Sequence, residues 1–163
     1  MLIQMGEQKH NRERNGVLDL RLLNKERVAL QVRVKDWKEA VRVSGQLLVD
    51  VGSIESCYID AIIENMQEYG PYFVLAPGVA MPHASCSFGV HQVDISVVTL
   101  ANEVAFMDSL NNPVKLVICL AATDNNSHIE LLKKVSQILS DETCVQRVKH
   151  AKTVEEVLTI FNS

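Results

Sequence analysis

The sequence predicts an α/β fold in which a mixed β-sheet is flanked by helices. Apolar and polar residues alternate over 27–34, as in a half-buried strand. Residues 114–122 are almost wholly apolar, as in a strand that is covered on both faces. Amphipathic segments of helical period stand between and after these strands. Strands and helices in this order are typical of one layered domain.

The first half of the chain is expected to hold two helices. Asp36 is placed to cap the first, with a glutamate three residues on as in a capping box, and Gly52 is expected to end it. The second helix covers about 57–69 and is stopped by Gly70-Pro71. Residues 72–76 are expected to form a short strand.

The second half is expected to begin with a strand and to end in helices. Alternation predicts a strand over 93–100, ahead of the apolar strand 114–122. Ser127 opens a capping box, which predicts a helix as far as Leu139. A short helix is expected after Asp141, and a second capping box at Thr153 starts the last one.

Length and composition indicate one globular domain. The chain has 163 residues, enough to bury a stable core. Residues 1–16 are polar around 7–14 and are expected to form a flexible N-terminal extension, with the domain over 17–163. A formal net charge of -4 without a basic block argues against a nucleic-acid partner.

Cysteine usage and hydropathy favour a cytoplasmic protein. No apolar run reaches the roughly 20 residues of a membrane-spanning helix. The four cysteines show no CxxC spacing, and Cys119 lies inside an apolar run, where a reduced, buried thiol is expected.

One histidine is presented by an apolar stretch, residues 74–84, which contains a Pro-Gly turn and ends in Pro82-His83-Ala84. Proline has a fixed φ and no N–H, and it pushes the preceding residue toward extended geometry. The imidazole of His83 is therefore expected at the end of an extended segment, within reach of a reactant. A partly buried structural histidine is the alternative, and the sequence does not separate the two.

A second histidine, His128, follows Ser127 at the expected start of a helix. A helix N-terminus carries partial positive charge and free N–H groups, so it favours anions. If His83 and His128 meet, the pair suits a phosphoryl group, with a nucleophilic nitrogen on His83 and a donor on His128. The sequence alone does not establish that they meet.

The remaining candidate ligands have no spacing typical of a catalytic or metal site. Three further histidines are expected to be solvated or structural: His10, His91 and His150. The acidic residues that could join the histidines around a metal are loosely placed: Asp94, Asp124 and Glu130. Because no HExxH or comparable cluster occurs, no metal and no other cofactor are expected.

The segment from Gly70 to His83 resembles the phosphorylation site of enzyme IIA components of the mannitol/fructose class in the bacterial phosphotransferase system. It is most similar to the ascorbate-specific branch of that class. The resemblance extends over residues 18–161 and takes in three further segments: 37–41, 58–62 and 126–132. It implies the mannitol/fructose-type IIA fold.

The resemblance also implies roles for both histidines. In that family the histidine after the proline accepts a phosphoryl group from the phosphocarrier HPr and passes it to a cysteine of enzyme IIB. By position, His83 is the acceptor, and His128 is the second histidine, which hydrogen-bonds the phosphoryl group. The implied partners are HPr, enzyme IIB and, indirectly, a membrane IIC permease, with L-ascorbate as the sugar. The sequence leaves homodimerisation open.

One departure from the mannitol branch concerns the charge at the site. That branch has an arginine upstream of the acceptor, where this chain has Met-Gln-Glu-Tyr over 66–69, so no guanidinium is expected to clamp the phosphate. Backbone N–H groups and imidazole donors are expected instead. Ser85 and Ser87 are further candidate donors. Three apolar residues are candidates for a collar that excludes water: Phe73, Val79 and Met81.

Two other functions stay open at the level of the sequence. The first is a regulatory module of the same fold that is controlled by phosphorylation. The second is a metal- or histidine-dependent hydrolase, which would turn over without HPr. A carrier for another sugar is a variant of the main hypothesis.

Overall fold

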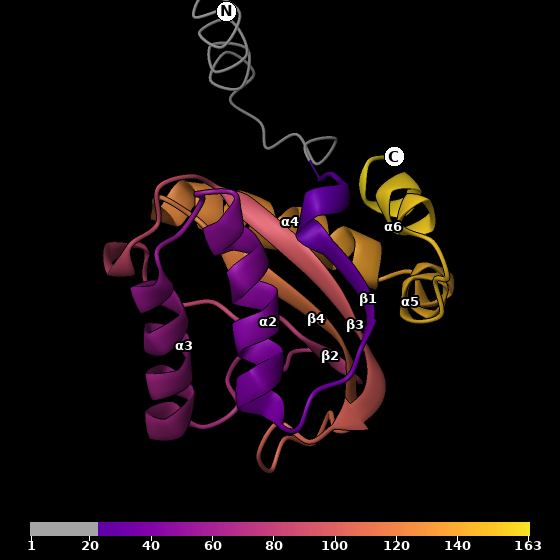
Figure 1. The fold of residues 1–163 in the computed structure, drawn as a ribbon, viewed down its shortest axis with the longest axis horizontal. Coiled ribbons are helices and arrows are strands. Elements are labelled where there is room, and N and C mark those ends of the chain that lie inside the picture. The colour runs from indigo at the N-terminus through magenta and orange to yellow at the C-terminus, as the bar shows by residue number, and fades with distance from the viewer. Residues whose placement is uncertain (1–22) are drawn as a thin grey trace, which may run out of the picture.

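The computed structural model describes residues 23–163, so the expected extension over residues 1–16 lies outside the described part. A four-stranded sheet forms its centre, in the order β1-β3-β4-β2 (Figure 1). The strands are β1 (Val28–Val32), β2 (Val79–Ala80), β3 (Asp94–Val104) and β4 (Val114–Ala121). The β3–β4 pair is antiparallel, whereas β1 pairs with β3 and β2 with β4 in parallel, so the predicted mixed sheet is confirmed.

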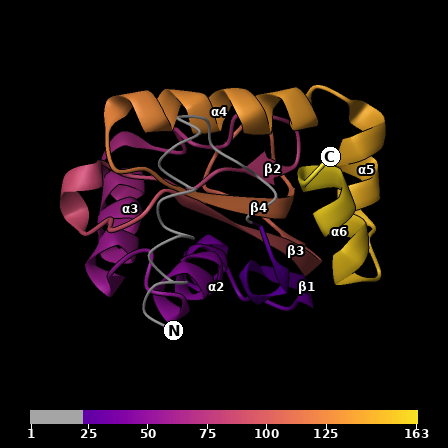
Figure 2. The same cartoon turned by 90° about the horizontal axis from the view of Figure 1, so that it is seen from above.

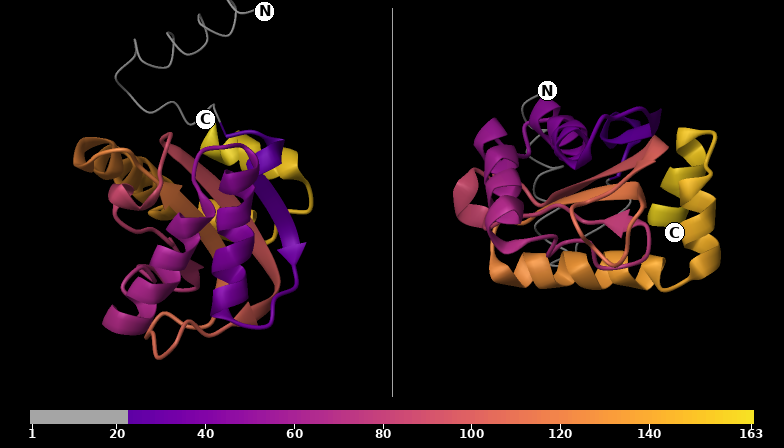
Figure 3. Two further views of the ribbon diagram at one scale, coloured as in Figure 1. Left: turned by 60° about the vertical axis from the view of Figure 1, so that its left-hand side comes forward. Right: turned by 90° about the horizontal axis from the view of Figure 1, so that it is seen from below.

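Helices cover both faces of the sheet (Figure 2). The α-helices are α2 (Trp37–Asp50), α3 (Ser56–Tyr69), α4 (Asn125–Leu139), α5 (Glu142–Lys149) and α6 (Val154–Phe161), with short 3-10 turns η2 (Lys25–Arg27) and η3 (Cys86–Phe88). The helices α2 and α3 lie on one face. Seen from below, α4 runs along the opposite side of the molecule and leads into α5 and α6 (Figure 3, right).

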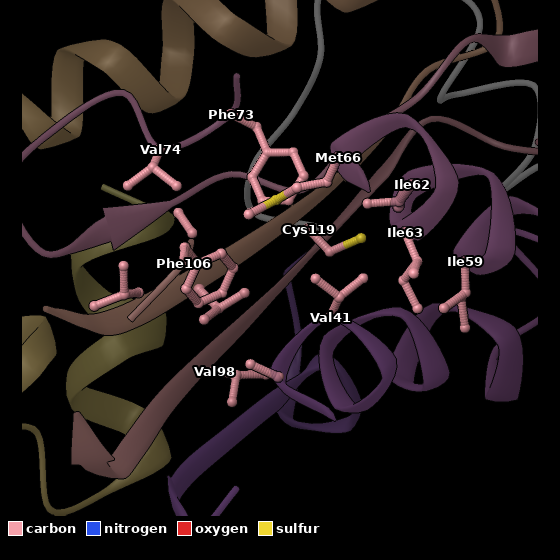
Figure 4. Close-up of a cluster of buried hydrophobic side chains, with 14 of the residues drawn as sticks. Val41, Ile59, Ile62, Ile63, Met66, Phe73, Val74, Val98, Phe106 and Cys119 are labelled. Atoms are coloured by element: carbon pink, nitrogen blue, oxygen red, sulfur yellow. The ribbon is translucent and has the colours of Figure 1, made fainter. Parts of the chain in front are cut away.

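Two hydrophobic cores result, one on each face, and β4 contributes alternate residues to both. Val117 and Cys119 pack in the core beneath α2 and α3, which Figure 4 shows around Phe73 and Met66. The residues that alternate with these along β4 pack beneath α4, α5 and α6: Leu116, Ile118 and Leu120. Burial raises the pKa of Cys119 to about 12, so this thiol stays protonated, as expected of a buried cysteine.

Most predicted helix boundaries are confirmed because their capping chemistry forms. The Asp36 carboxylate accepts the backbone N–H of Glu39 at 2.9 Å. Thr153 caps α6 through the N–H of Glu156. The second helix ends at Gly70, which adopts a φ of 86°, a left-handed value that glycine tolerates best.

The expected strand over 72–76 is wrong. Residues 72 and 73 lie in a turn and Ala76 makes an isolated bridge to Val79, and the strand falls instead at Val79–Ala80, after the Pro-Gly turn. This strand, β2, pairs in parallel with β4, with Val79 opposite Leu116 and Ala80 opposite Val117. Apolar character in 72–76 reflects burial of Phe73 and Val74 in the core, not pairing in the sheet.

Two strand ends also differ from expectation. The strand expected to end at residue 100 continues to Val104, and the first strand ends at Val32 instead of residue 34. Near that end, Gln31 has a φ of 54°, and its N–H donates to the Thr99 hydroxyl at 2.9 Å. The pairing of β1 with β3 is irregular there, between Ala29 and Val32.

Candidate active site

A pocket of about 510 Å³ lies where α3, the chain around residue 84 and the start of α4 meet. It is lined by Asn65, Tyr69, Tyr72, His83, Ala84, Ser85, Cys86, Ala122, Asp124, Asn125 and His128. Both histidines singled out in the sequence are therefore in one cavity. Among residues 23–163, this lining includes no lysine or arginine.

One ring nitrogen of His83 is hydrogen-bonded to the backbone two residues earlier in the chain. Nδ1 lies 2.7 Å from the carbonyl oxygen of Met81. A carbonyl oxygen can only accept a hydrogen bond, so Nδ1 carries the proton in this contact. In the neutral imidazole the lone pair is then on Nε2, and this nitrogen is the nucleophilic one.

The two histidines are neighbours. Their ring centroids are 5.0 Å apart, with an angle of 48° between the ring planes. Burial lowers the pKa of His83 below its ordinary value of 6.5, and repulsion from His128 lowers it further, although the hydrogen bond to Met81 opposes both effects. Burial also lowers the pKa of His128. Both imidazoles are therefore mainly neutral at pH 7.

The start of α4 differs from the expectation. The helix begins at Asn125, and its N-cap is Asp124, not a residue at 127. The Asp124 carboxylate accepts the N–H of Ser127 at 2.7 Å, and the Ser127 hydroxyl is bonded in return to the Asp124 backbone. The capping box therefore exists, but it is displaced by three residues, because aspartate is a strong N-cap and Ser127 occupies the third helical position.

This displacement changes the electrostatics expected near His128. The side chain lies in the first turns of α4, but a carboxylate already occupies the end of the helix. The exposed Asp124 has a lowered pKa, chiefly because of its hydrogen bond from the Ser127 backbone, and it stays ionised at pH 7. The Asp124 carboxylate therefore takes the Ser127 N–H, which the expectation had left free for an anion.

Among the residues that the structure describes, no guanidinium lines the pocket. The lining residues that α3 contributes are Asn65 and Tyr69, both without charge. The pKa of Tyr72 is raised by burial, and a hydrogen bond from the Asn65 side chain opposes part of that rise. The wall of the pocket that α3 forms therefore carries the amide of Asn65 and the hydroxyl of Tyr69 and no cation.

The candidate serines and collar residues take different places. Ser85 lines the pocket, and its hydroxyl is 3.0 Å from that of Ser87, which does not line it. None of the three apolar residues expected as a collar lines the cavity: Phe73, Val79 and Met81 are buried in the cores. Phe73 still approaches the His83 ring, with centroids 6.4 Å apart.

The other titratable candidates lie elsewhere. His91 is exposed and faces Glu55 at 3.4 Å, and His150 is exposed at the end of α5, whereas His10 lies outside the described residues. Asp94 is buried, where its carboxylate is paired with Arg27 and accepts the Ser53 hydroxyl at 2.6 Å. Within residues 23–163, no three side chains of the metal-binding types form a cluster.

Sequence reasoning missed the tyrosines of the site. Tyr58 and Tyr72 bond the backbone beside His83, and Asn65 joins the pocket from α3. The backbone partners of Tyr58 lie 26 and 62 positions along the chain, and that of Tyr72 lies 11 positions along it. Such pairs leave no periodic or motif signal in the sequence.

An α/β domain of this topology has the fold of a phosphotransferase IIA component. The family model described as "Phosphoenolpyruvate-dependent sugar phosphotransferase system, EIIA 2" matches residues 21–163, and the chain belongs to this family. No helix of the described residues is both long enough and apolar enough to cross a membrane.

Individual relatives agree with this assignment. The chain is 36% identical to the ascorbate-specific PTS system EIIA component of Escherichia coli K12, over 83% of this chain and 88% of that protein. The solution structure of the mannitol-specific cryptic enzyme IIA CmtB from E. coli matches with a TM-score of 0.81 and 32% identity, over 89% of this chain and 99% of that one.

A further solved structure is a complex. In it, the E. coli mannitol enzyme IIA is bound to phosphorylated enzyme IIB; the match has a TM-score of 0.76 and 27% identity, over 85% of this chain and 96% of that one.

Proposed function

We propose that this protein is a phosphoryl carrier that accepts a phosphoryl group from phospho-HPr on His83 and passes it to a cysteine of an enzyme IIB. The observation that carries the proposal is the fixed state of the His83 ring. Nδ1 is held as a donor on the Met81 carbonyl, so the Nε2 lone pair is available for attack on phosphorus. The lowered pKa keeps that lone pair unprotonated at pH 7.

In the transfer step, Nε2 of His83 forms a bond to phosphorus as the bond from phosphorus to the HPr nitrogen breaks. The leaving imidazole of HPr keeps the electron pair of the broken bond. Such transfers pass through a loose transition state, in which positioning and charge stabilisation matter more than covalent chemistry. In this proposal His128, whose ring centroid is 5.0 Å from that of His83, donates to a phosphoryl oxygen.

A carrier needs an accessible site for two protein partners in turn. Three exposed apolar side chains lie beside the pocket: Tyr69 is 70% exposed, Ile129 50% and Phe88 46%. Tyr69 lines the pocket itself, Ile129 follows His128 in α4, and Phe88 lies in η3, which begins at the pocket residue Cys86. Exposed apolar residues grouped around a reactive centre favour docking of a protein. The complex of the related mannitol enzyme IIA with its phosphorylated IIB supports the second partner.

The proposed sugar is L-ascorbate, taken up through a membrane IIC permease that works with the IIB protein. Its support is the likeness to ascorbate-specific EIIA components. The uncharged side chains Asn65 and Tyr69, at the place where the mannitol branch keeps an arginine, agree with this choice. A cytoplasmic location follows from the proposal, since HPr and IIB work there. The proposed carrier domain covers residues 17–163.

The proposal is tested by incubating the protein with phosphoenolpyruvate, enzyme I and HPr. The wild type is expected to gain one phosphoryl group that is lost in acid and survives alkali, as a phosphohistidine does. His83→Ala should take up none, whereas His150→Ala, which removes an exposed histidine at the end of α5, should behave as the wild type. Uptake by His83→Ala, or none by the wild type, would contradict the proposal.

A further inference from the structure

The four residues that carry the reactive imidazole are held by hydrogen bonds from three separate parts of the chain. The Met81 N–H donates to the Phe73 carbonyl at 2.9 Å, and the Leu120 N–H of β4 donates to the Pro82 carbonyl at 2.9 Å. These two bonds fix the segment up to Pro82. The second bond holds the peptide group that precedes His83, but neither bond reaches the peptide group between His83 and Ala84.

Two tyrosine hydroxyls bond the carbonyl and the N–H of that peptide group. The Tyr72 hydroxyl donates to the carbonyl oxygen of His83. On the next residue, the Ala84 N–H donates to the Tyr58 hydroxyl at 3.0 Å, and this hydroxyl donates in turn to the Leu120 carbonyl at 2.7 Å. Tyr58 therefore ties Ala84 to the same residue of β4 that bonds Pro82.

The environments of the two hydroxyls agree with a fixed role. Tyr58 is 1% exposed, and its burial raises the pKa of its hydroxyl well above the ordinary range, so the proton needed for the bond to Leu120 is retained. Tyr72 is half-buried and stacks edge-on against the His83 ring, with centroids 5.6 Å apart and planes at 87°. Its contact with His83 therefore involves both the ring and the backbone.

We propose that Tyr72 and Tyr58 are positioning residues for the acceptor, which hold the His83 peptide so that Nδ1–H stays on the Met81 carbonyl and Nε2 stays free. The bond from Nδ1 to Met81 spans only two residues, so it requires a fixed backbone between them and through His83 itself. If the carbonyl of His83 lost its donor, the peptide could rotate and the ring could exchange its tautomer. This role rests on the proposed function, but the tautomer can be measured without it.

The test is a pair of readouts on Tyr72→Phe, which removes one hydroxyl and keeps the ring. The ¹⁵N shifts of the His83 ring, measured at a pH where it is neutral, should show one tautomer with Nδ1–H in the wild type and a mixture in Tyr72→Phe. The rate of phosphoryl uptake from phospho-HPr should fall about tenfold, as expected when one hydrogen bond no longer restrains the reacting group.

Two controls separate positioning from general stability. Tyr69→Phe removes a hydroxyl from the same pocket that bonds no backbone group near His83, and it should leave the ¹⁵N signature as in the wild type. Asn102→Ala removes two bonds to Val34 at the far end of β3, and it should reduce stability without changing the tautomer or the uptake rate. Tyr58→Phe, if it folds, should resemble Tyr72→Phe.

The outcomes are distinct. A single tautomer and a wild-type rate in Tyr72→Phe would overturn the positioning role, as would an equal loss of rate in Asn102→Ala. If the wild type took up no phosphoryl group at all, the proposed function would fail, while the tautomer of Tyr72→Phe would still decide whether the tyrosine orients His83.

Discussion

The protonation state of His83 decides at which pH the acceptor is usable. Burial and the neighbouring His128 both favour the neutral imidazole. The pKa of His83 in the folded protein therefore lies below 6.5. Its ring consequently stays neutral and nucleophilic at pH values where a free histidine is already protonated. The same shift means that the unfolded chain binds a proton first, so this group reduces stability as the pH falls below 6.5 toward the folded pKa.

Replacing the neighbour should move this pKa in a defined direction. His128→Gln removes the repulsion but keeps a side chain of similar size, so the pKa of His83 should rise toward 6.5. The acid limb of the uptake rate should shift to higher pH with it. Both quantities can be measured, by NMR titration of the His83 ring and by uptake from phospho-HPr over a pH series. An unchanged or lower pKa in His128→Gln would contradict this account of the pair.

Some residues of the site have a local signal in the sequence, and others do not. Pro82-His83 and His128 were recognisable because a proline and a helix start have local sequence signals. Tyr58 and Tyr72 were not, since the first bonds a carbonyl 62 positions away and the second acts through the backbone of His83. Only the fold brings these groups together.

At the scale of elements, α3 is placed against α2 by a close contact at Gly45. A Cβ built on Gly45 would stand 2.5 Å from Cγ1 and 2.8 Å from Cδ1 of Ile59, a buried side chain of α3. This glycine therefore sets how near the two helices approach. Since α3 carries both Tyr58 and Asn65, the contact also sets one wall of the pocket.

Gly45→Ala should destabilise the protein even though alanine is the better helix former. In an open helix the change would stabilise by about 1 kcal/mol. Here the clash with Ile59 should outweigh that gain and cost about 1–3 kcal/mol, as overpacking usually does. Urea unfolding gives the free energy of the wild type and the variant. In an Ile59→Ala background the same change should cost less, and a stabilised single variant would refute the close contact.

Element boundaries were predictable where the capping side chain acts on its own helix. Asp36 and Thr153 are such cases. The start of α4 was misplaced because Asp124 and Ser127 are both capping residues, and local sequence does not rank a serine against an aspartate three positions earlier. The strand expected over 72–76 was wrong for another reason: its apolar residues serve the core, and only the pairing of β4 shows where the edge strand lies.

Exposed large apolar residues occur in several places among residues 23–163. One is the group beside the pocket, formed by Tyr69, Phe88 and Ile129. Another lies in the loop between β3 and β4, where Leu110 is fully exposed. This loop precedes β4, whereas the pocket residue Ala122 follows it, so the loop and the pocket lie at opposite ends of that strand. Only the first region adjoins the reactive histidines, so the two regions provide a matched comparison.

Ile129→Glu should weaken docking of the phosphoryl donor without disturbing the fold. The side chain is half exposed, so a charge there costs little in the free protein but is unfavourable in an apolar interface. Uptake at limiting phospho-HPr should fall about tenfold, the effect of a moderate interface residue. Leu110→Glu should leave uptake and melting temperature unchanged. Equal effects of both variants would argue against docking beside the pocket.

Locating the phosphoryl group on one ring nitrogen tests most directly whether His83 is the acceptor. The protein, labelled with ¹⁵N and phosphorylated by phosphoenolpyruvate, enzyme I and HPr, can be examined for ³¹P–¹⁵N coupling in alkaline solution. We predict one phosphorus atom on Nε2 of His83, with Nδ1 still protonated and bound to the Met81 carbonyl. Phosphorus on Nδ1 of His83, or on His128, would contradict it.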